Sequence, residues 1–258
     1  MDSDKIRRQW SQRQQDHGND PKSVLMKGVH SRFNQTIDLW HRHVIRRVFG
    51  KVDSGSKSYV LDIGCGYGRL ANELEALGFL PIGLDFTPGF CKTFLQKFEY
   101  SVCADLSALP FSEGSIFHAY SVTSLMYVDS NEAKEALSQV DQSLVAGAIV
   151  LILEPSYEFN RFIRFFLPQK GLDNLAVPGF RREQFYGGLA PSNWVVVESG
   201  SNIATTVFLP LLLLFGRWRA LYAFFSRLVL FLDRPSSRAG WLGARIAMYR
   251  WVAYRKMA

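Results

Sequence analysis

Between residues 59 and 154 the chain alternates short apolar runs with longer amphipathic stretches. The apolar runs are rich in Val, Ile and Leu, as strands buried on both faces are. The stretches between them repeat their apolar positions every three to four residues, which is typical of helices that pack on a sheet. The pattern predicts strands at 59–63, 80–85, 100–104, 116–121 and 148–154, with helices at 68–77, 88–97 and 131–144.

Outside this central region the pattern predicts helices at one end of the chain and strands towards the other. Residues 4–50 should be helical with a break at Pro21, and the second helix should run from about Ser23 to Val48. A short helix near 181–188 should precede a strand at 194–198, and a last strand should span 248–256. Because strands and helices alternate, we expect an α/β fold with a mainly parallel sheet covered on both faces.

Three glycines follow the first predicted strand, in the segment Asp62-Ile63-Gly64-Cys65-Gly66-Tyr67-Gly68. Glycine lets a ligand approach bare backbone, and the N-terminus of the helix that follows offers unpaired N–H groups. A P-loop would end in Gly-Lys-Ser or Gly-Lys-Thr, which this segment lacks. A dinucleotide-binding turn would have its third glycine at the position of Arg69, so the spacing also argues against that class.

Two acidic residues close the second and third predicted strands. Asp85 stands about 20 residues beyond the glycine turn, the spacing at which a carboxylate meets the hydroxyls of a ribose. Such a carboxylate accepts from both hydroxyls, and its charge strengthens these bonds. Asp105 follows the third strand, where an acid can accept from an exocyclic amine such as that of adenine.

In this order and spacing, the glycine segment, Gly83-Leu84-Asp85, Ala104-Asp105-Leu106 and Leu109-Pro110-Phe111 resemble the successive motifs of class I S-adenosylmethionine (SAM) dependent methyltransferases, in the small-molecule, type-11-like branch. The resemblance implies SAM as cofactor and a Rossmann-like seven-stranded sheet with the strand order 3-2-1-4-5-7-6. It also implies a methyltransferase domain over 51–258 and an N-terminal helical lid segment over 1–50; helices that only pack on the sheet are the alternative for this segment.

The resemblance further implies which residues hold SAM. Asp85 would hold the ribose, Phe86 would lie beside the adenine, and Asp105 would contact it. The full set, from the methionine portion to the adenine, is Ser121, Val122, Asp62, Gly64, Cys65, Gly66, Asp85, Phe86, Asp105 and Leu106. One departure is Phe117-His118, where the family often has Phe-Asp, so an acid or metal role at that position is in doubt. We predict no metal site.

A long segment, 201–245, separates the last two predicted strands. The strand before it should run parallel to the others and end at the carboxyl edge of the sheet, where open α/β sheets bind ligands, so we expect this hydrophobic, helical insertion on the active-site side. A helix at 219–234 within it has two sides. One side is polar (Arg219, Tyr222, Ser226, Arg227, Asp233 and Arg234) and the other apolar (Leu221, Phe224, Phe225, Leu228, Val229, Phe231 and Leu232).

Basic residues gather in this part of the chain. The formal net charge is +7, and residues 206–258 contain nine Lys and Arg residues against one acid, Asp233. The apolar runs are shorter than the ~20 residues of a membrane span, and arginines interrupt them. Two explanations stay open: helices that cap the pocket, and an in-plane contact of 206–234 with an anionic membrane surface. The aliphatic content argues against a nucleic-acid partner.

Methyl transfer from a sulfonium is an in-line displacement, so positioning and exclusion of water can supply most of the catalysis. A base is needed only when the acceptor is a hydroxyl or a protonated amine. The candidates are Tyr127 after the fourth strand, Glu154 at the end of the fifth strand, and His30 from the proposed lid. Glu154 has a second explanation, as a strand-end acid bonded to loop backbone.

The three cysteines form no disulfide or metal-binding pattern, and the N-terminus begins no apolar run. We therefore expect a cytoplasmic protein, in or out of contact with a membrane surface. Three functions stay open: methylation of O or N of a hydrophobic or lipid-linked small molecule, methylation of a soluble metabolite or natural product, and SAM binding by an accessory protein without turnover. The oligomeric state is unknown.

Overall fold

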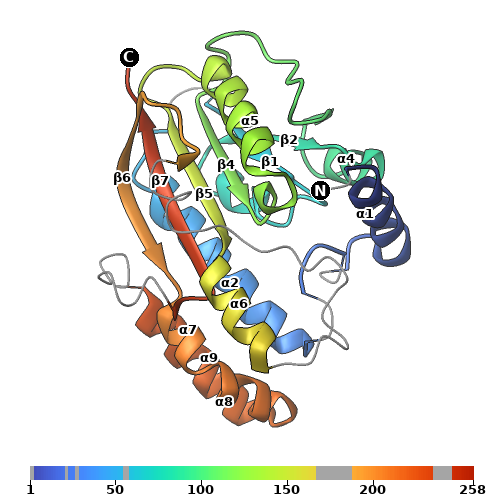
Figure 1. The fold of residues 1–258 in the computed structure, drawn as a ribbon, viewed down its shortest axis with the longest axis vertical. Helices are drawn as coiled ribbons and strands as arrows, with labels where there is room; N and C mark the ends of the chain where they lie inside the picture. Colours follow the sequence, from blue (N-terminus) through green and yellow to red (C-terminus); the bar gives the residue numbers. More distant parts are fainter. Residues whose placement is uncertain (1–2, 21–22, 27–28, 55–57, 167–187, 235–245) are drawn as a thin grey trace.

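The computed structural model describes residues 3–20, 23–26, 29–54, 58–166, 188–234 and 246–258. A seven-stranded sheet with the order β3-β2-β1-β4-β5-β7-β6 forms its centre, which confirms the predicted fold class (Figure 1). The strands are β1 (Tyr59–Ile63), β2 (Leu80–Asp85), β3 (Tyr100–Cys103), β4 (His118–Val122), β5 (Ile149–Pro155), β6 (Trp194–Ser201) and β7 (Tyr249–Lys256). Only β7 runs antiparallel to its neighbours β5 and β6, so the other strands all point the same way.

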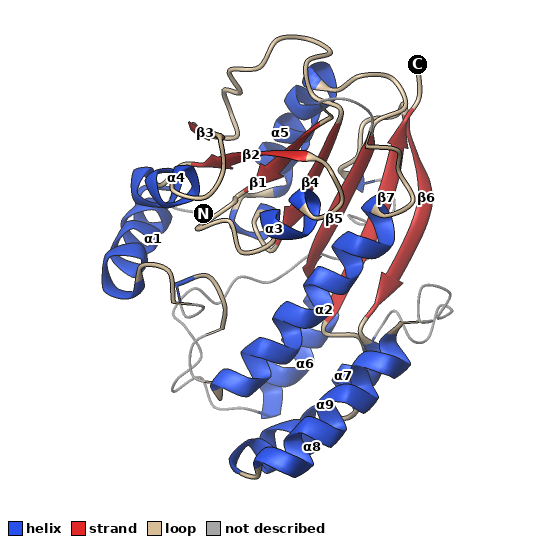
Figure 2. Ribbon diagram, turned by 180° about the vertical axis from the view of Figure 1, so that it is seen from behind, coloured by secondary structure: helices blue, strands red, loops and turns tan. Residues whose placement is uncertain are grey.

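Helices cover both faces of the sheet, as Figure 2 shows from behind. They are α1 (Ser3–His17), α2 (Ser31–Phe49), α3 (Ala71–Glu75), α4 (Pro88–Leu95), α5 (Ser130–Ser143), α6 (Tyr157–Phe166), α7 (Ile203–Val207), α8 (Leu209–Leu214) and α9 (Arg219–Asp233). Short 3-10 turns, η2 (Leu125–Tyr127) and η4 (Phe215–Arg217), follow β4 and α8. The helix predicted near 181–188 lies largely outside the described residues.

The local sequence explains where several helices begin. Asp129 caps α5 by accepting from Asn131 and Glu132, and the Glu132 side chain accepts from the Asp129 N–H, which is a complete capping box. The predicted start of the second helix near Ser23 was wrong, because α2 begins at Ser31. His30 adopts an extended conformation there, and its Nδ1 accepts from Arg32 N at 3.1 Å.

Two layers of apolar side chains enclose the sheet. On one face α2 packs through Phe33, Ile37 and Trp40 against Tyr120 of β4 and Leu151 of β5. On the other face α5 packs through residues such as Leu137 and Val140. Every residue of β5 is buried, as the continuous apolar run from Ile149 to Leu153 predicts for a central strand.

Helices α7 to α9 follow the end of β6 and lie beyond the carboxyl ends of the strands (Figure 1). The sequence expectation placed the insertion 201–245 at this edge because β6 was expected to run parallel to the main sheet. Within the described residues, no helix is both long and apolar enough to cross a membrane. The loops that follow β1, β2 and β3 lie at the same edge of the sheet, and α1 packs beside them against α4.

Candidate functional site

The glycine turn after β1 has a backbone that only glycine adopts readily. Gly64, Gly66 and Gly68 have φ values of +72°, +52° and +77°, in the left-handed region. A Cβ on Gly64 would lie 2.2 Å from Ser124 Oγ, and one on Gly66 would lie 2.9 Å from Val24 Cγ1. Glycine is therefore required at both positions, by the backbone conformation and by the packing of Ser124 and Val24, and the turn presents bare backbone.

Asp85, at the end of β2, is tied to this turn. One carboxylate oxygen accepts from Gly66 N at 3.1 Å and the other from Thr87 N at 2.8 Å. Burial raises the pKa of Asp85, and these two backbone bonds act against the rise. A carboxylate offers about four acceptor positions, so the aligned Asp85 retains capacity for two hydroxyl donors of a ligand.

Asp105 follows β3 on the far side of the crevice and meets helix α1. Arg7 forms an ion pair with Asp105 and also lies over the ring of Phe86, with its Cζ 5.6 Å from the ring centroid. Burial raises the pKa of Asp105, but hydrogen bonds from Ser107 and the nearby Arg7 outweigh it and leave the pKa below its ordinary value. Asp105 is therefore held ionised.

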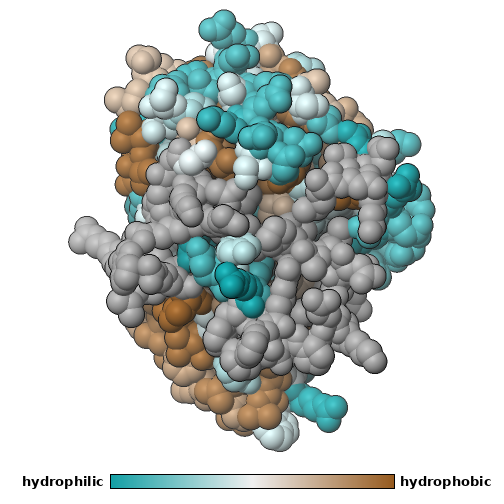
Figure 3. Space-filling model, viewed as in Figure 1, coloured by the Kyte–Doolittle hydropathy of each residue, from teal (hydrophilic) through white to brown (hydrophobic). Residues whose placement is uncertain are grey.

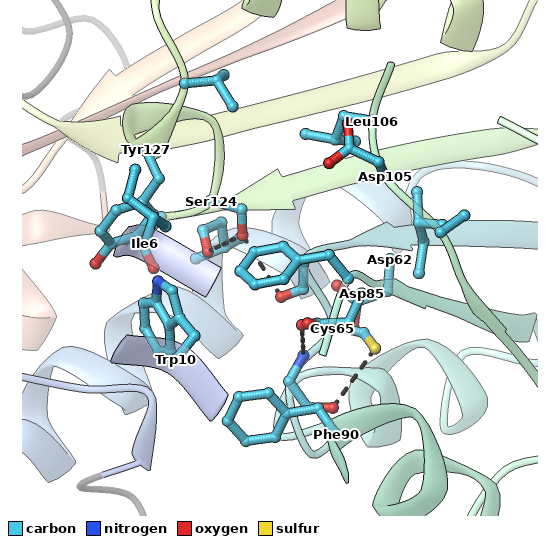
Figure 4. Close-up of a pocket in the computed structure, with 18 of the residues that line it drawn as sticks. Ile6, Trp10, Asp62, Cys65, Asp85, Phe90, Asp105, Leu106, Ser124 and Tyr127 are labelled. Atoms are coloured by element: carbon cyan, nitrogen blue, oxygen red, sulfur yellow. Dashed lines mark hydrogen bonds between the residues drawn. The ribbon is translucent and has the colours of Figure 1, made fainter. Parts of the chain in front are cut away.

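These groups line one cavity of about 340 Å³, which is within the size range of small-molecule sites. Figure 4 shows its two sides: Asp62, Asp85 and Asp105 lie on one side, and Trp10 and Tyr127 with Ile6 on the other. The apolar side is continued by Val24, Leu70, Phe90 and Val128. Trp10 and Tyr127 meet edge to face with ring centroids 5.2 Å apart, so α1 and the segment after β4 are in contact on this side of the cavity.

Two buried charged residues, Asp62 and Arg69, also line the cavity. Burial raises the pKa of Asp62 to about 7, while Tyr120 and Arg69 act in the opposite direction. Arg69 is held by Asp38 of α2, with 2.7 Å between Nη1 and Oδ1. Arg69 occupies the position at which a dinucleotide-binding turn has its third glycine. That observation was available in the sequence, although it did not lead to a site prediction for Arg69.

Nine of the ten residues predicted to surround SAM line this cavity; these are Asp62, Gly64, Cys65, Gly66, Asp85, Phe86, Asp105, Leu106 and Val122. Ser121 does not line it. Its hydroxyl lies 3.5 Å from Glu154 Oε1, because neighbouring residues of a strand point to opposite faces and Val122 takes the cavity side. Thr123 and Ser124 line the cavity in its place, and Thr123 has a φ of +58°. The sequence did not predict the cavity residues Ser124, Ile6, Trp10, Val24 and Phe90.

The three candidate bases are separated in the structure. Tyr127 lines the cavity. Glu154 is completely buried behind it, and its Oε1 accepts from the backbone of Ser124 at 3.0 Å and Leu125 at 2.9 Å. This position favours the second explanation of Glu154, a strand-end acid bonded to loop backbone, over its role as a base.

His30 also does not line the cavity. It caps α2, and its ring lies beside Gly216, where an added Cβ would be 3.5 Å away. The N-terminal segment reaches the cavity through α1, with Ile6, Arg7 and Trp10, and through Val24 instead. Among the described residues, no group of three or more His, Cys, Asp or Glu side chains is arranged to hold a metal ion.

Residues 60–147 match the family described as "Methyltransferase domain". This stretch contains the glycine turn, Asp85 and Asp105, which the structure brings to one cavity at the carboxyl edge of the sheet. Together with the strand order, the match identifies a class I SAM-dependent methyltransferase domain, and SAM is the cofactor of that class.

A curated relative is the 18S rRNA (guanine-N(7))-methyltransferase bud23 of Schizosaccharomyces pombe, which is 24% identical over 99 residues. The aligned stretch spans 37% of this chain and 37% of that protein. Among solved structures, geranyl diphosphate C-methyltransferase from Streptomyces coelicolor A3(2), in complex with Mg²⁺, geranyl diphosphate and S-adenosyl-L-homocysteine, has a TM-score of 0.55 at 14% identity and covers 86% of this chain and 82% of its own.

A SAM dependent methyltransferase from Archaeoglobus fulgidus is similar in the same way. Its TM-score is 0.54 at 14% identity, and the match covers 85% of this chain and 94% of that one. At these identities the structural similarities establish the fold, and the acceptor molecule is a separate question.

Proposed function

We propose that this protein transfers the methyl group of SAM to an oxygen or nitrogen of a hydrophobic or lipid-linked small molecule. The observation that supports the proposal is the two-sided cavity. Three acids and a glycine turn line one side, and Ile6, Trp10, Phe90 and Tyr127 line much of the other. An aromatic and aliphatic wall favours an acceptor that loses water easily.

The donor side fits SAM residue by residue. Asp85 would accept from the ribose hydroxyls, Phe86 and Leu106 would lie along the adenine, and Asp105 would accept from its amine. The glycine turn and Val122 would border the methionine portion. The positive φ values of Gly64 and Gly66 let the turn present bare backbone, which a cradle for a ligand requires.

Bound SAM supplies an electrophilic methyl group, and the sulfonium sulfur that carries it is the leaving group and becomes a neutral thioether. The protein residues would therefore act mainly by orientation and exclusion of water. Trp10 and Tyr127 meet edge to face and together cover one side of the cavity. Of the three candidate bases, Tyr127 alone is at the cavity and can position an acceptor hydroxyl or amine.

Two other functions differ in what would be methylated or bound. A soluble metabolite or natural product would use the same donor side, and an accessory protein would bind SAM without turnover. The similarity to a relative named for methylating 18S rRNA makes RNA a further acceptor to test. A cytoplasmic enzyme at a membrane surface would meet lipid-like acceptors directly, and this location is part of the proposal.

Incubation of the protein with methyl-labelled SAM and cell lysate distinguishes these acceptors. We expect label in the organic phase after extraction. Label in small molecules of the aqueous phase would support the soluble acceptor, and label in RNA would support an acceptor like that of the curated relative. If the protein releases no more S-adenosylhomocysteine with lysate than without it, the result would support the accessory role.

The donor site has its own test, which does not depend on the acceptor. Asp85→Ala removes two charge-assisted hydrogen bonds, each of roughly 1.5–3 kcal/mol, so we expect at least about a 100-fold loss of SAM affinity in calorimetry. Glu113→Ala, which removes an exposed carboxylate away from the cavity, should leave the affinity unchanged. Equal affinity in the Asp85 variant and the unchanged protein would overturn the donor assignment.

A further inference from the structure

Helix α9 is an amphipathic helix that buries several polar side chains and leaves some of its largest apolar side chains exposed. Its buried residues are Tyr222, Ser226, Val229 and Asp233, which recur every three to four positions and are mostly polar. An ordinary surface helix buries its apolar side and exposes its polar side. The sequence predicted two sides for this helix, and the structure turns much of the polar one inward.

Specific hydrogen bonds hold the polar stripe against the protein. Thr36 of α2 lies 2.7 Å from the hydroxyl of Tyr222 and 2.9 Å from that of Ser226, oxygen to oxygen. The Asp233 carboxylate accepts from Ala204 N at 2.7 Å, and from Thr205 N at 3.0 Å and Thr205 Oγ1 at 2.6 Å. Because buried polar groups are costly without partners, these bonds fix which side of α9 faces outward.

Large apolar side chains occupy the outward side. Phe224 and Phe231, two helical turns apart, are 61% and 65% exposed, and Leu221 and Leu232 flank them. The preceding segment continues the surface with Leu214 and Trp218, which are 63% and 56% exposed. Figure 3 shows hydrophobic residues gathered at the end of the molecule where α7 to α9 lie. We call the exposed side chains of 213–232 the α8–α9 face.

Every exposed charge on this face is positive. Arg217, Arg219 and Arg227 are exposed, and no carboxylate among the described residues pairs with them. Asp233, the one acid of residues 206–234, is buried on the opposite side of α9. The surface thus combines Phe, Leu and Trp with arginine, the composition of helices that lie in the plane of an anionic membrane.

We infer that the α8–α9 face docks onto the surface of an anionic lipid bilayer, with Phe224 and Phe231 in the acyl boundary and the arginines at the headgroups. The charge pattern favours this occupant over a second copy of the chain, in which like-charged arginines would face each other. The inference does not depend on the proposed acceptor, because no residue of 206–234 lines the cavity.

The test is co-sedimentation of the full chain with vesicles of phosphatidylcholine alone or with 30 mol% phosphatidylglycerol, a composition of about one anionic lipid in three. We expect binding to the anionic vesicles only. Phe224→Asp and Phe231→Asp should each weaken it at least about tenfold, because each removes an aromatic anchor and adds a negative charge. Arg219→Ser with Arg227→Ser should weaken it by about thirtyfold, since each arginine contributes about fivefold.

The matched control is Leu95→Asp, which changes a 50% exposed leucine on α4, away from this face. It should bind vesicles as the unchanged protein does, and all variants should retain their melting temperature and SAM affinity, which shows that they fold. Failure of the unchanged protein to bind anionic vesicles would overturn the inference, as would equal losses in the control. A dimer in light scattering that Phe224→Asp dissociates would also overturn it and identify a second copy as the occupant.

These outcomes are separate from those of the methyltransferase assay. A vesicle-binding protein without SAM affinity would refute the donor site and leave the docking face intact. A protein that binds SAM but not vesicles would refute the docking face and leave the donor site intact.

Discussion

Helices α2 and α9 pack against each other and yet differ in which side chains they expose. α2 buries Phe33, Ile37 and Trp40, while its charges pair near the surface, as between Arg42 Nε and Asp38 Oδ2 at 2.7 Å. α9 buries a polar stripe and exposes Phe224 and Phe231. Both helices are amphipathic, so amphipathicity by itself does not say which side faces the protein.

The partner decides that orientation. The stretch of α2 that faces α9 includes Thr36, whose hydroxyl meets two hydroxyls of α9. A polar group at that position favours a polar neighbour, because an unpaired buried hydroxyl would be costly. Substitutions in the two helices should therefore have different effects on the free energy of unfolding, and these effects can test the contrast.

The largest effect should come from the apolar side of α2. Trp40 is 1% exposed, and its ring centroid lies 6.1 Å from that of Tyr249. Trp40→Ala should lower the free energy of unfolding by about 3–5 kcal/mol, because it removes a large buried side chain and leaves a cavity. Urea unfolding followed by circular dichroism measures it. A loss below about 1 kcal/mol would mean that α2 is not anchored through this side.

Glu154 extends the contrast to a buried carboxyl group of which only one oxygen, Oε1, has hydrogen-bond partners. No described residue bonds to its Oε2, and burial raises its pKa to about 8 from an ordinary 4.5, against the opposing effect of backbone hydrogen bonds. The unfolded chain loses this proton near pH 4.5 and the folded chain keeps it to about pH 8, so stability should fall as the pH rises between these values.

The fall due to Glu154 should be on the order of 3 kcal/mol, and Glu154→Gln should abolish it. The measurement is urea unfolding of both proteins between pH 5 and pH 8, a range of about 3 units. Because Asp62, Asp85 and Asp233 titrate in both proteins, the difference between the two curves isolates Glu154. Parallel curves would show that Glu154 is ionised in the folded chain and would reopen its role as a base.

Asp233→Ala should have a smaller effect of about 2 kcal/mol on the free energy of unfolding. The substitution leaves the donors of Ala204 and Thr205 without their acceptor, although water can reach part of this end of α9. Asp233→Asn, which keeps one acceptor oxygen, should recover about half of the loss. A value near zero for Asp233→Ala would show that the buried polar stripe does not hold α9.

The smallest effect on stability should come from the outward side of α9. Phe224→Ser should change the free energy of unfolding by no more than about 0.5 kcal/mol in lipid-free buffer, as for other exposed positions. Thermal unfolding with and without anionic vesicles measures it, and the two proteins should differ more when vesicles are present. A large destabilisation in buffer alone would mean that Phe224 is covered in solution.

The sequence was sufficient for the sheet and for most of the polar lining of the cavity. Alternation of apolar runs predicted the strands, and the glycine turn with Asp85 and Asp105 predicted one cavity because carboxyl ends of parallel strands meet at one edge. These features depend on residues that are close in the chain, or on positions repeated in every strand. Local patterns record both.

The errors concern contacts between distant segments. Ser121 and Val122 are neighbours on β4 and point to opposite faces, so only one of the two can line the cavity, and the tertiary structure places Val122 there. Val24 and Trp10 reach the cavity only because the N-terminal segment folds across it. The outward side of α9 depended on Thr36 and Thr205, and no property of residues 219–234 alone specifies these partners.

Arg7 has a consequence for how ligand binding in the cavity and the position of helix α1 affect each other. One guanidinium contacts both Asp105 and Phe86, so a purine at these two residues must share them with helix α1 or displace its arginine. Donor occupancy and the docking of α1 are then thermodynamically linked. The factor by which the bound ligand changes the docking equilibrium of α1 equals the factor by which the docking of α1 changes the dissociation constant of the ligand.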